Sequence, residues 1–257
     1  MAYQTILWEA ADGVGRLTLN RPDQRNGVTG LMLQELYDAV RRAATDDDLR
    51  VVVLTGAGGS FCVGADLRHY ADGAADAGAP ETAFDVTRLL HELPAVTVAA
   101  VNGAAAGAGF GWACACDLRF ATRSAVFNSA FLDVAVAGDM AGPWTLPRLV
   151  GAAKARELYF LPGRFGADEA HRIGLVVDVF DDDAFTDGIE AVVARLAAAA
   201  PLAIRGMKAN FLDGETLSLA DYVAVETQRH VQIAASRDTA EAFRAFVDKR
   251  KPHFEGR

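Results

Sequence analysis

The sequence predicts an α/β fold in which strand–strand–helix units occupy residues 1–190 and a helical region occupies residues 191–257. Three observations support this prediction. Residues 51–55 form an apolar run, as expected for a strand that is buried on both faces. A glycine-rich stretch follows this run, and another follows the apolar run 95–101; each leads into a helical pattern. After Pro143, apolar residues recur mainly at helical spacing.

The N-terminal unit begins with a predicted hairpin. Apolar and polar residues alternate in residues 6–8 and 14–20, and Asp12 and Gly13 between them are typical of a hairpin turn. A proline-containing turn ends this unit. Thr29 is a suitable N-cap for the next helix, which stops at an acidic cluster near residue 46.

The remaining helices are predicted from apolar residues at helical spacing, and the remaining strands from alternating or continuous apolar residues. The expected strands lie at residues 51–55, 95–101, 118–121, 125–127 and 175–180. The expected helices lie at residues 84–93, 112–116, 144–150, 152–160, 167–173, 184–199, 202–212, 217–235 and 238–250. Between residues 71 and 83, small residues and glycines predict a mobile loop.

Composition excludes several classes of protein. The 257 residues have a formal net charge of −9, which disfavours a nucleic-acid partner because such proteins are usually basic. Neither a signal-peptide pattern nor an apolar run of about 18 residues is visible, so we expect no membrane partner. Cys62, Cys114 and Cys116 lack CxxC spacing; we expect reduced core cysteines, no metal site and a cytoplasmic location.

Two stretches, 56–66 and 102–111, share one pattern. Each follows a buried strand, is rich in glycine and alanine, and precedes a helix. Free backbone N–H groups at such a junction can hold a phosphate, or a carbonyl oxygen that gains negative charge. A dinucleotide-binding GxGxxG does not fit residues 107–111, and no P-loop lysine follows either stretch. Tight turns made only for packing would give the same composition.

Several blocks of the sequence resemble the enoyl-CoA hydratase/isomerase (crotonase) family. They span the chain in order and lie at residues 20–22, 61–67, 101–109, 119–122, 161–175 and 242–252. The resemblance implies a crotonase-like spiral of ββα units with a helical C-terminal trimerisation region. It also implies a homotrimer or a hexamer (a dimer of trimers), and acyl-CoA thioester substrates. Coenzyme A then enters as part of the substrate, with no further cofactor.

The same resemblance assigns roles to individual residues. In this family the N–H groups that match Ala65 and Ala108 form an oxyanion hole that polarises the thioester carbonyl. Basic residues near the positions of Arg25 and Arg68 meet CoA in this family. Lys249, in a terminal basic cluster, is a candidate to reach the CoA of the same or a neighbouring subunit, and the alternative is a solvated charge cluster at the end of a helix. The residues expected to bind substrate or CoA are Arg25, Gly64, Ala65, Asp66, Leu67, Arg68, Gly107, Phe131, Trp144 and Lys249.

Two positions depart from the hydratases of this family, which use two glutamates. Alignment of the blocks puts Gly111 and Phe131 at these positions, and neither side chain can transfer a proton. Asp139 matches the catalytic aspartate of other family branches. Its flanking residues look closest to the phenylacetate-pathway enoyl-CoA isomerase type.

The favoured function is therefore double-bond or ring isomerisation, in which Asp139 is the base that removes a proton and returns it elsewhere. For Asp139 itself the alternative is an N-cap role at the helix that starts near Pro143. Two other functions remain open for the chain. One is a 2-enoyl-CoA hydratase of the fatty-acid β-oxidation type that lacks the usual glutamate pair. The other is a non-catalytic acyl-CoA-binding homologue.

Overall fold

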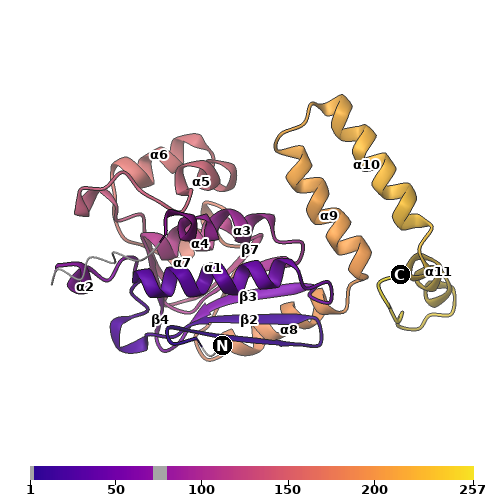
Figure 1. Ribbon diagram of the computed structural model, residues 1–257, viewed down its shortest axis with the longest axis horizontal. Coiled ribbons are helices and arrows are strands. Elements are labelled where there is room, and N and C mark those ends of the chain that lie inside the picture. Colours follow the sequence, from indigo (N-terminus) through magenta and orange to yellow (C-terminus); the bar gives the residue numbers. More distant parts are fainter. Residues whose placement is uncertain (1–2, 72–79) are drawn as a thin grey trace.

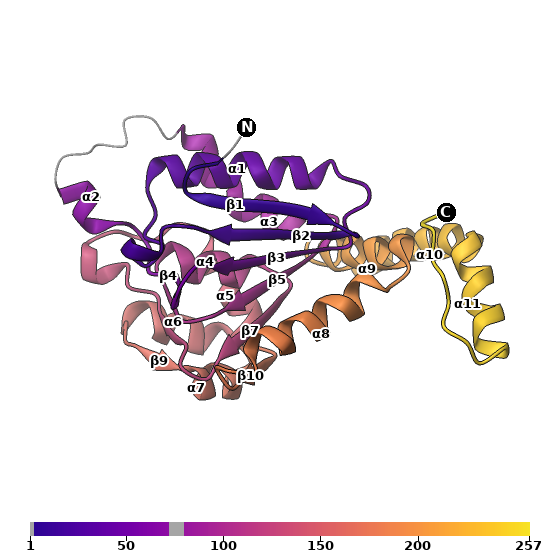
Figure 2. The ribbon, with the colours of Figure 1, turned by 90° about the horizontal axis from the view of Figure 1, so that it is seen from below.

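The computed structural model describes residues 3–71 and 80–257 of the chain (Figures 1 and 2). Among these residues the larger sheet has the strand order β1-β2-β3-β5-β7-β10 and is parallel except for the β1–β2 hairpin. Its strands are β1 (Ile6–Ala11), β2 (Val14–Leu19), β3 (Val51–Gly56), β5 (Val96–Val101), β7 (Leu118–Thr122) and β10 (Asp178–Phe180). Asp12 and Gly13 both have positive φ, as the predicted hairpin turn requires.

A smaller sheet has the order β4-β6-β8-β9, made of β4 (Ser60–Cys62), β6 (Ala104–Ala106), β8 (Val126–Asn128) and β9 (Phe165–Gly166). After the hairpin, successive units place their first strand in the larger sheet and their second strand in the smaller one. The pairs β3 and β4, β5 and β6, and β7 and β8 all follow this rule. The predicted ββα spiral is therefore confirmed.

Helices complete each unit. They are α1 (Gly30–Ala44), α2 (Leu67–Ala71), α3 (Val86–Glu92), α4 (Ala108–Ala115), α5 (Gly142–Val150), α6 (Ala152–Phe160), α7 (Ala167–Arg172), α8 (Phe185–Ala197), α9 (Pro201–Gly214), α10 (Leu219–Ala234) and α11 (Arg237–Val247). Short 3-10 helices lie at Pro22–Gln24, Glu81–Asp85 and Leu132–Val134. The Thr29 hydroxyl accepts a hydrogen bond from the Met32 N–H, so the predicted N-cap of α1 is confirmed.

Both faces of the larger sheet are buried at its central strands β3 and β5, which explains their apolar sequences. On one face, Val52, Leu54 and Ala99 belong to the main core together with α1, α3 and α4. On the other face, Val51, Val53 and Val98 pack with the buried side of α8. The core thus holds the carboxyl ends of β3 and β5 in place, and both glycine-rich stretches start there.

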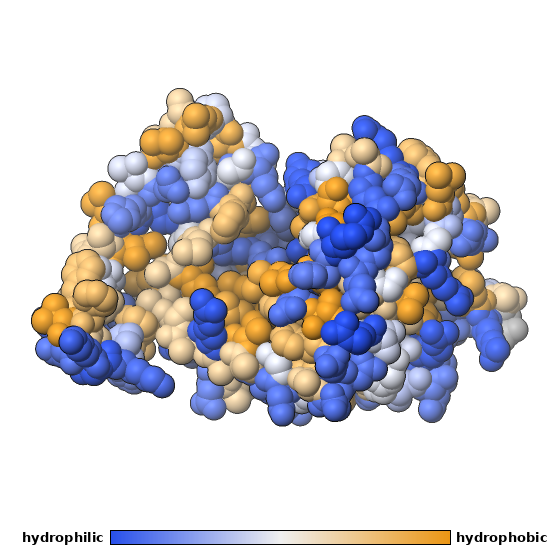
Figure 3. Space-filling model, turned by 180° about the vertical axis from the view of Figure 1, so that it is seen from behind, coloured by the Kyte–Doolittle hydropathy of each residue, from blue (hydrophilic) through white to orange (hydrophobic). Residues whose placement is uncertain are grey.

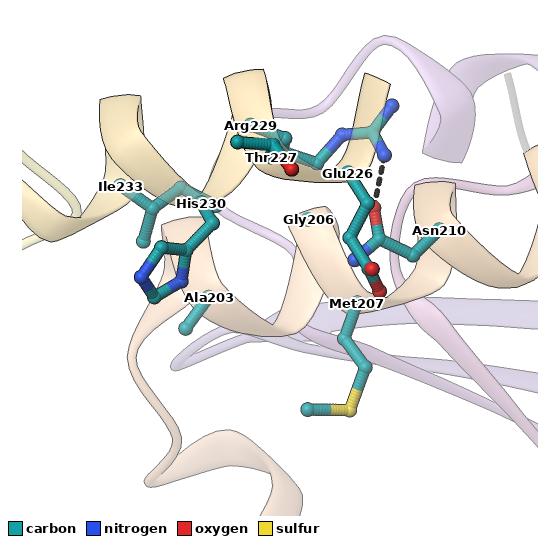
Figure 4. A pocket seen from close by; sticks show the side chains of 9 residues that line it. All are labelled: Ala203, Gly206, Met207, Asn210, Glu226, Thr227, Arg229, His230 and Ile233. Carbon is teal, nitrogen blue, oxygen red and sulfur yellow. Dashed lines mark hydrogen bonds between the residues drawn. The ribbon is translucent and has the colours of Figure 1, made fainter. Parts of the chain in front are cut away.

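The last three helices, α9–α11, project from the core (Figures 1 and 2). We call them the helical arm. α9 and α10 run antiparallel with a cavity of about 400 Å³ between them (Figure 4). Gly206 lets them approach, since a Cβ there would lie 2.4 Å from Cδ1 of Ile233. Many apolar side chains of the arm are exposed, and Figure 3 shows such side chains beside a hollow.

The glycine-rich stretches contain more regular structure than predicted. Residues 104–106 form β6, and α4 begins at Ala108 instead of Trp112. The correction has a packing cause: a Cβ at Gly109 would lie 2.4 Å from the Cys62 carbonyl oxygen, so α4 needs glycine to lie against β4. Close packing here overrides the low helix propensity of glycine.

The predicted strand at 175–180 is also too long, because only Asp178–Phe180 pairs. The N–H groups of Leu175 and Val176 are bound to the Ala170 carbonyl at the end of α7 instead. The predicted boundary at residue 190 lies inside α8, all of which belongs to the core side, so the arm starts near residue 200. Most of the predicted mobile loop, residues 72–79, lies outside the described residues. No described helix is long and apolar enough to cross a membrane.

Candidate active site

The two glycine-rich loops touch through their backbones. β4 and β6 are parallel neighbours, and Gly64 and Gly107 follow them with φ of 87° and 50°. A Cβ on Gly64 would lie 3.1 Å from the Ala106 carbonyl oxygen, and one on Gly107 would lie 3.3 Å from Cα of Gly64. Glycine is required at both positions for its conformation and for the close approach.

The next residue in each loop has an N–H group without a backbone acceptor among the described residues. Val28 donates to the Gly64 oxygen at 2.8 Å and accepts from the Asp66 N–H at 3.0 Å, so the Ala65 N–H points away from this pairing. Ala108 is the first residue of α4, and its N–H has no intrahelical acceptor. The N–H groups of Ala65 and Ala108 thus come directly after two glycines whose backbones are in contact. Such an arrangement can hold an oxygen that carries negative charge.

Asp66 fixes the first loop. Its carboxylate binds the Arg21 guanidinium at 2.9 Å and accepts from the His69 N–H at 3.2 Å. Burial alone would raise the pKa of Asp66, but the His69 N–H and the Arg21 charge outweigh it and lower the pKa. Asp66 thus stays ionised as an anchor, and Arg21 also donates to the Gly27 carbonyl.

Asp139 is a carboxylate in a different environment. It is half-buried, and its Oδ1 atom is buried without a hydrogen-bond partner among the described residues. Burial raises the pKa of Asp139, and the hydrogen bond to its own N–H offsets this only in part. The N-cap of α5 is Ala141, with no side-chain cap bond, so the N-cap alternative for Asp139 is wrong.

The surroundings of Asp139 connect it to the loops. Burial raises the pKa of the Cys62 thiol to about 12, and the charge of Asp139 adds to this shift. Cys62 ends β4 and contacts α4 at Gly109. Burial and then the charges of Cys114 and Asp139 likewise raise the pKa of Tyr159. The next residue, Met140, packs against Gly111 of α4, so Asp139 lies beside the helix that begins at Ala108.

The two expected glutamate positions are occupied differently. A Cβ on Gly111 would lie 2.5 Å from Cβ of Met140, so Met140 occupies the space that a side chain at 111 needs. Phe131 is buried and stacks on Tyr159 with ring centroids 6.0 Å apart. The Phe131 ring also lies 4.0 Å from the Cβ position of Gly107, so it borders the second loop.

The other predicted binding residues lie in three places. Arg25, Leu67 and Arg68 are exposed beside the first loop, and the Arg25 Nε lies 3.5 Å from the Ser60 Oγ. Trp144 lies on α5, and the Cζ atom of Arg148 lies over its ring, 3.7 Å from the ring centroid. Lys249 follows α11, and α11 and α2 are at opposite ends of the molecule (Figure 2). Within one chain, Lys249 is thus not brought to the loops.

Two further residues shape the site without any sequence signal. Met140 follows Asp139, and the Tyr159 hydroxyl would lie 1.6 Å from a Cβ on Gly142. The loop 138–142 therefore closes around Tyr159, whose hydroxyl is buried without a partner among the described residues. In sequence, Tyr159 has the spacing of an ordinary packing residue of α6.

Comparison with known proteins gives a consistent result. The family model described as "Enoyl-CoA hydratase/isomerase" matches residues 9–257. A Rhodobacter capsulatus protein named a probable enoyl-CoA hydratase is 37% identical, with 100% of both chains covered. The Escherichia coli 1,2-epoxyphenylacetyl-CoA isomerase is 34% identical, with 98% of both covered. The crystal structure of an enoyl-CoA hydratase from Bacillus anthracis has a TM-score of 0.90 at 31% identity, covering 99% of this chain and 100% of that one.

Proposed function

Because this chain belongs to the enoyl-CoA hydratase/isomerase family, we propose that it isomerises acyl-CoA thioesters by moving a proton next to the carbonyl, with Asp139 as the base. One observation carries the proposal: Asp139 is a half-buried carboxylate of raised pKa, and the next residue, Met140, packs on α4, whose first N–H group lacks a backbone acceptor. A base and a pair of donors for the developing oxyanion are the parts that a proton shift needs.

The proposed step starts from a 3-enoyl-CoA. The Asp139 carboxylate removes a proton from C2, the electron pair of the C2–H bond forms a C1=C2 double bond, and the carbonyl π pair moves onto the thioester oxygen. The N–H groups of Ala65 and Ala108 stabilise this enolate; each such donor is worth about 3–4 kcal/mol in enzymes where one was removed. The enolate then collapses and takes the proton at C4, which moves the double bond to C2–C3. The carboxylate is regenerated, and the oxidation level of the substrate is unchanged, so the step needs no redox cofactor.

The environment of Asp139 suits this role. Burial raises its pKa and makes its carboxylate a stronger base than a solvated aspartate. No basic side chain of the described residues contributes to its pKa, so ion pairing does not weaken the base. Asp66 is unsuitable as the base because its ion pair with Arg21 weakens its basicity.

We further propose that CoA lies over the first loop. Arg25 and Arg68 are exposed cations there, suited to CoA phosphates. Gly64, Asp66, Leu67 and Gly107 would shape the backbone around the thioester, and Phe131 and Trp144 would border the acyl group. Lys249, remote within one chain, would reach the CoA of a neighbouring subunit in a homotrimer or hexamer.

A second candidate is hydration of a 2-enoyl-CoA, favoured by relatives that are named hydratases. The closed position at Gly111 argues against it, since the first of two carboxylates has no room there. A ring isomerisation would use the same base and donors, and one relative is named an epoxyphenylacetyl-CoA isomerase.

The test compares the natural chain with Asp139→Asn on 3-enoyl-CoA and 2-enoyl-CoA esters. We expect 3-enoyl-CoA isomerisation to fall by about 10²–10⁴-fold, the usual contribution of a general base. Asp133→Asn, an exposed aspartate in the 3-10 helix Leu132–Val134, is the matched control and should keep its activity. A loss smaller than about tenfold would refute the base assignment. Loss of crotonyl-CoA absorbance would favour hydration, and CoA-ester binding without any turnover would favour a non-catalytic homologue.

A further inference from the structure

The backbone that follows Asp139 is strained. Met140 and Ala141 both have φ of 52°, in the left-handed region that residues other than glycine rarely adopt. Two successive residues of this kind persist only where the surrounding structure holds them. The candidate base therefore stands on a turn that needs an anchor.

The Met140 side chain supplies two contacts of this kind. Its sulfur accepts a hydrogen bond from Nε1–H of Trp112 at 3.1 Å and another from the Thr87 hydroxyl at 3.2 Å. Trp112 belongs to α4 and Thr87 to α3, so the thioether ties the turn to two helices. All three side chains are buried, with exposed fractions of 5%, 0% and 3% for Met140, Trp112 and Thr87.

The α4 backbone is shaped to receive this side chain. Gly111 precedes Trp112, and a Cβ there would collide with Met140 at 2.5 Å. Leucine at position 140 would fill a similar volume, but it would leave the buried Trp112 and Thr87 donors without their acceptor. The sulfur, and not only the volume, is therefore matched to the site.

We propose that Met140 is a positioning residue: its sulfur, held by Trp112 and Thr87, locks the strained turn that aims the Asp139 carboxylate at the substrate. This inference rests on the proposed function for its kinetic consequence, because Met140 acts through Asp139. A displacement of about 1 Å at a reacting group can cost about a hundredfold in rate.

The test uses Met140→Leu, which removes the acceptor, and Thr87→Val, which removes one donor at nearly constant shape. Each variant should lower kcat for 3-enoyl-CoA isomerisation by about tenfold while KM changes less than about twofold. Each variant should also shift the pH at which kcat falls on the acid side of its pH–rate profile. Thr87→Ser, which keeps the hydroxyl, should have the kcat and the pH–rate profile of the natural chain. The double variant should be no slower than Met140→Leu alone, because both changes break the same contact.

Thr122→Val, another buried threonine, located in β7, is the matched control and should affect stability only. A second measurement does not depend on turnover. It follows the stabilities of the natural chain and of Asp139→Asn over pH and records the pH at which they begin to differ. The same comparison is then made with Met140→Leu present in both chains. A shift in this pH without turnover in any variant would support the anchor and refute the proposed isomerase. Turnover that Met140→Leu and Thr87→Val leave unchanged, with only the melting temperature lowered, would refute the anchor and leave the proposed function standing.

Discussion

Asp139 holds a carboxylate in a half-buried position where burial opposes its charge. No cation among the described residues compensates for this, and one of its oxygen atoms has no partner. The charged Asp139 carboxylate therefore lowers the stability of the folded state, as expected where function and stability compete. Buried groups near it, Cys62 and Tyr159, have raised pKa values and stay neutral.

This cost predicts a pH-dependent stability. Because the folded pKa of Asp139 is raised, the folded state binds more protons than the unfolded state between the unfolded pKa, about 4, and the folded pKa. Stability from this group is complete below the unfolded pKa and is lost as pH rises through the folded pKa. Asp139→Asn should therefore be more stable than the natural chain at neutral pH; about 1 kcal/mol would raise Tm by about 2–4 °C.

Thermal unfolding from pH 4 to pH 8 measures this effect. The difference between Asp139→Asn and the natural chain should be smallest at low pH and should grow to a plateau. Asp133→Asn, whose carboxylate is exposed, provides the baseline. A constant difference across the range would contradict the raised pKa.

Individual residues differ in how far sequence can place them. Asp139 and the glycines of the two loops stand in recognisable blocks, so their positions follow from motif and spacing. Met140, Thr87 and Tyr159 have no such signal, because their roles depend on contacts between elements distant in sequence. The Thr87–Met140 contact, for example, joins positions 53 residues apart.

At the scale of elements, α9 is tied to the sheet by one buried ion pair. Lys208 on α9 is only 4% exposed and binds the Asp117 carboxylate. The other oxygen of Asp117 accepts from the N–H of Thr97 at 2.8 Å and from its hydroxyl at 2.9 Å. Asp117 thus joins the end of α4, the start of β5 and the first helix of the arm.

Removal of one partner should be costly. Lys208→Met keeps much of the apolar stem but leaves Asp117 without its cation. Loss of one partner of a buried pair usually costs about 3–5 kcal/mol, and the lower end applies because Asp117 is a quarter exposed. Urea unfolding would measure the change, with the exposed Lys251→Met as the control. A loss below about 0.5 kcal/mol, typical of a surface pair, would contradict this view of the contact.

The elements that escaped prediction are the shortest ones. β4 is Ser-Phe-Cys and β6 is Ala-Ala-Ala, and both lie inside the glycine-rich stretches, where three residues show no alternation. Longer elements were predictable: α1 shows apolar periodicity together with the capping residue Thr29, and β5 is a continuous apolar run. The start of α4 was not, since Gly109 and Gly111 in a helix are explained only by what lies against them.

At the scale of the molecule, the helical arm exposes apolar side chains that a single chain leaves uncovered (Figure 3). Phe211 and Leu219 near the α9–α10 connection are 73% and 78% exposed, and Phe243 and Phe246 on α11 are 69% and 86% exposed. Burial of one such side chain contributes about 1.5–3 kcal/mol. The arm therefore supports the proposed trimer or hexamer.

Phe243→Asp combined with Phe246→Asp should weaken this assembly. Light scattering should give three or six times 27.3 kDa for the natural chain and a smaller mass for the double variant. The association constant should drop by at least about a hundredfold, since two buried aromatic contacts are lost. Leu7→Gln, an exposed position on the edge strand β1 and not on the arm, should leave the mass unchanged. A natural chain that is monomeric at micromolar concentration would contradict the proposal.

The fit between Gly111 and Met140 restricts how this sequence can drift. Any side chain gained at 111 meets Met140 at 2.5 Å, so that change alone is unfavourable. A change at 140 alone removes the shared acceptor of Trp112 and Thr87. Both single-step routes to a carboxylate at 111 therefore pass through a less fit intermediate. A carboxylate at 111 therefore requires coupled substitutions at positions 111 and 140.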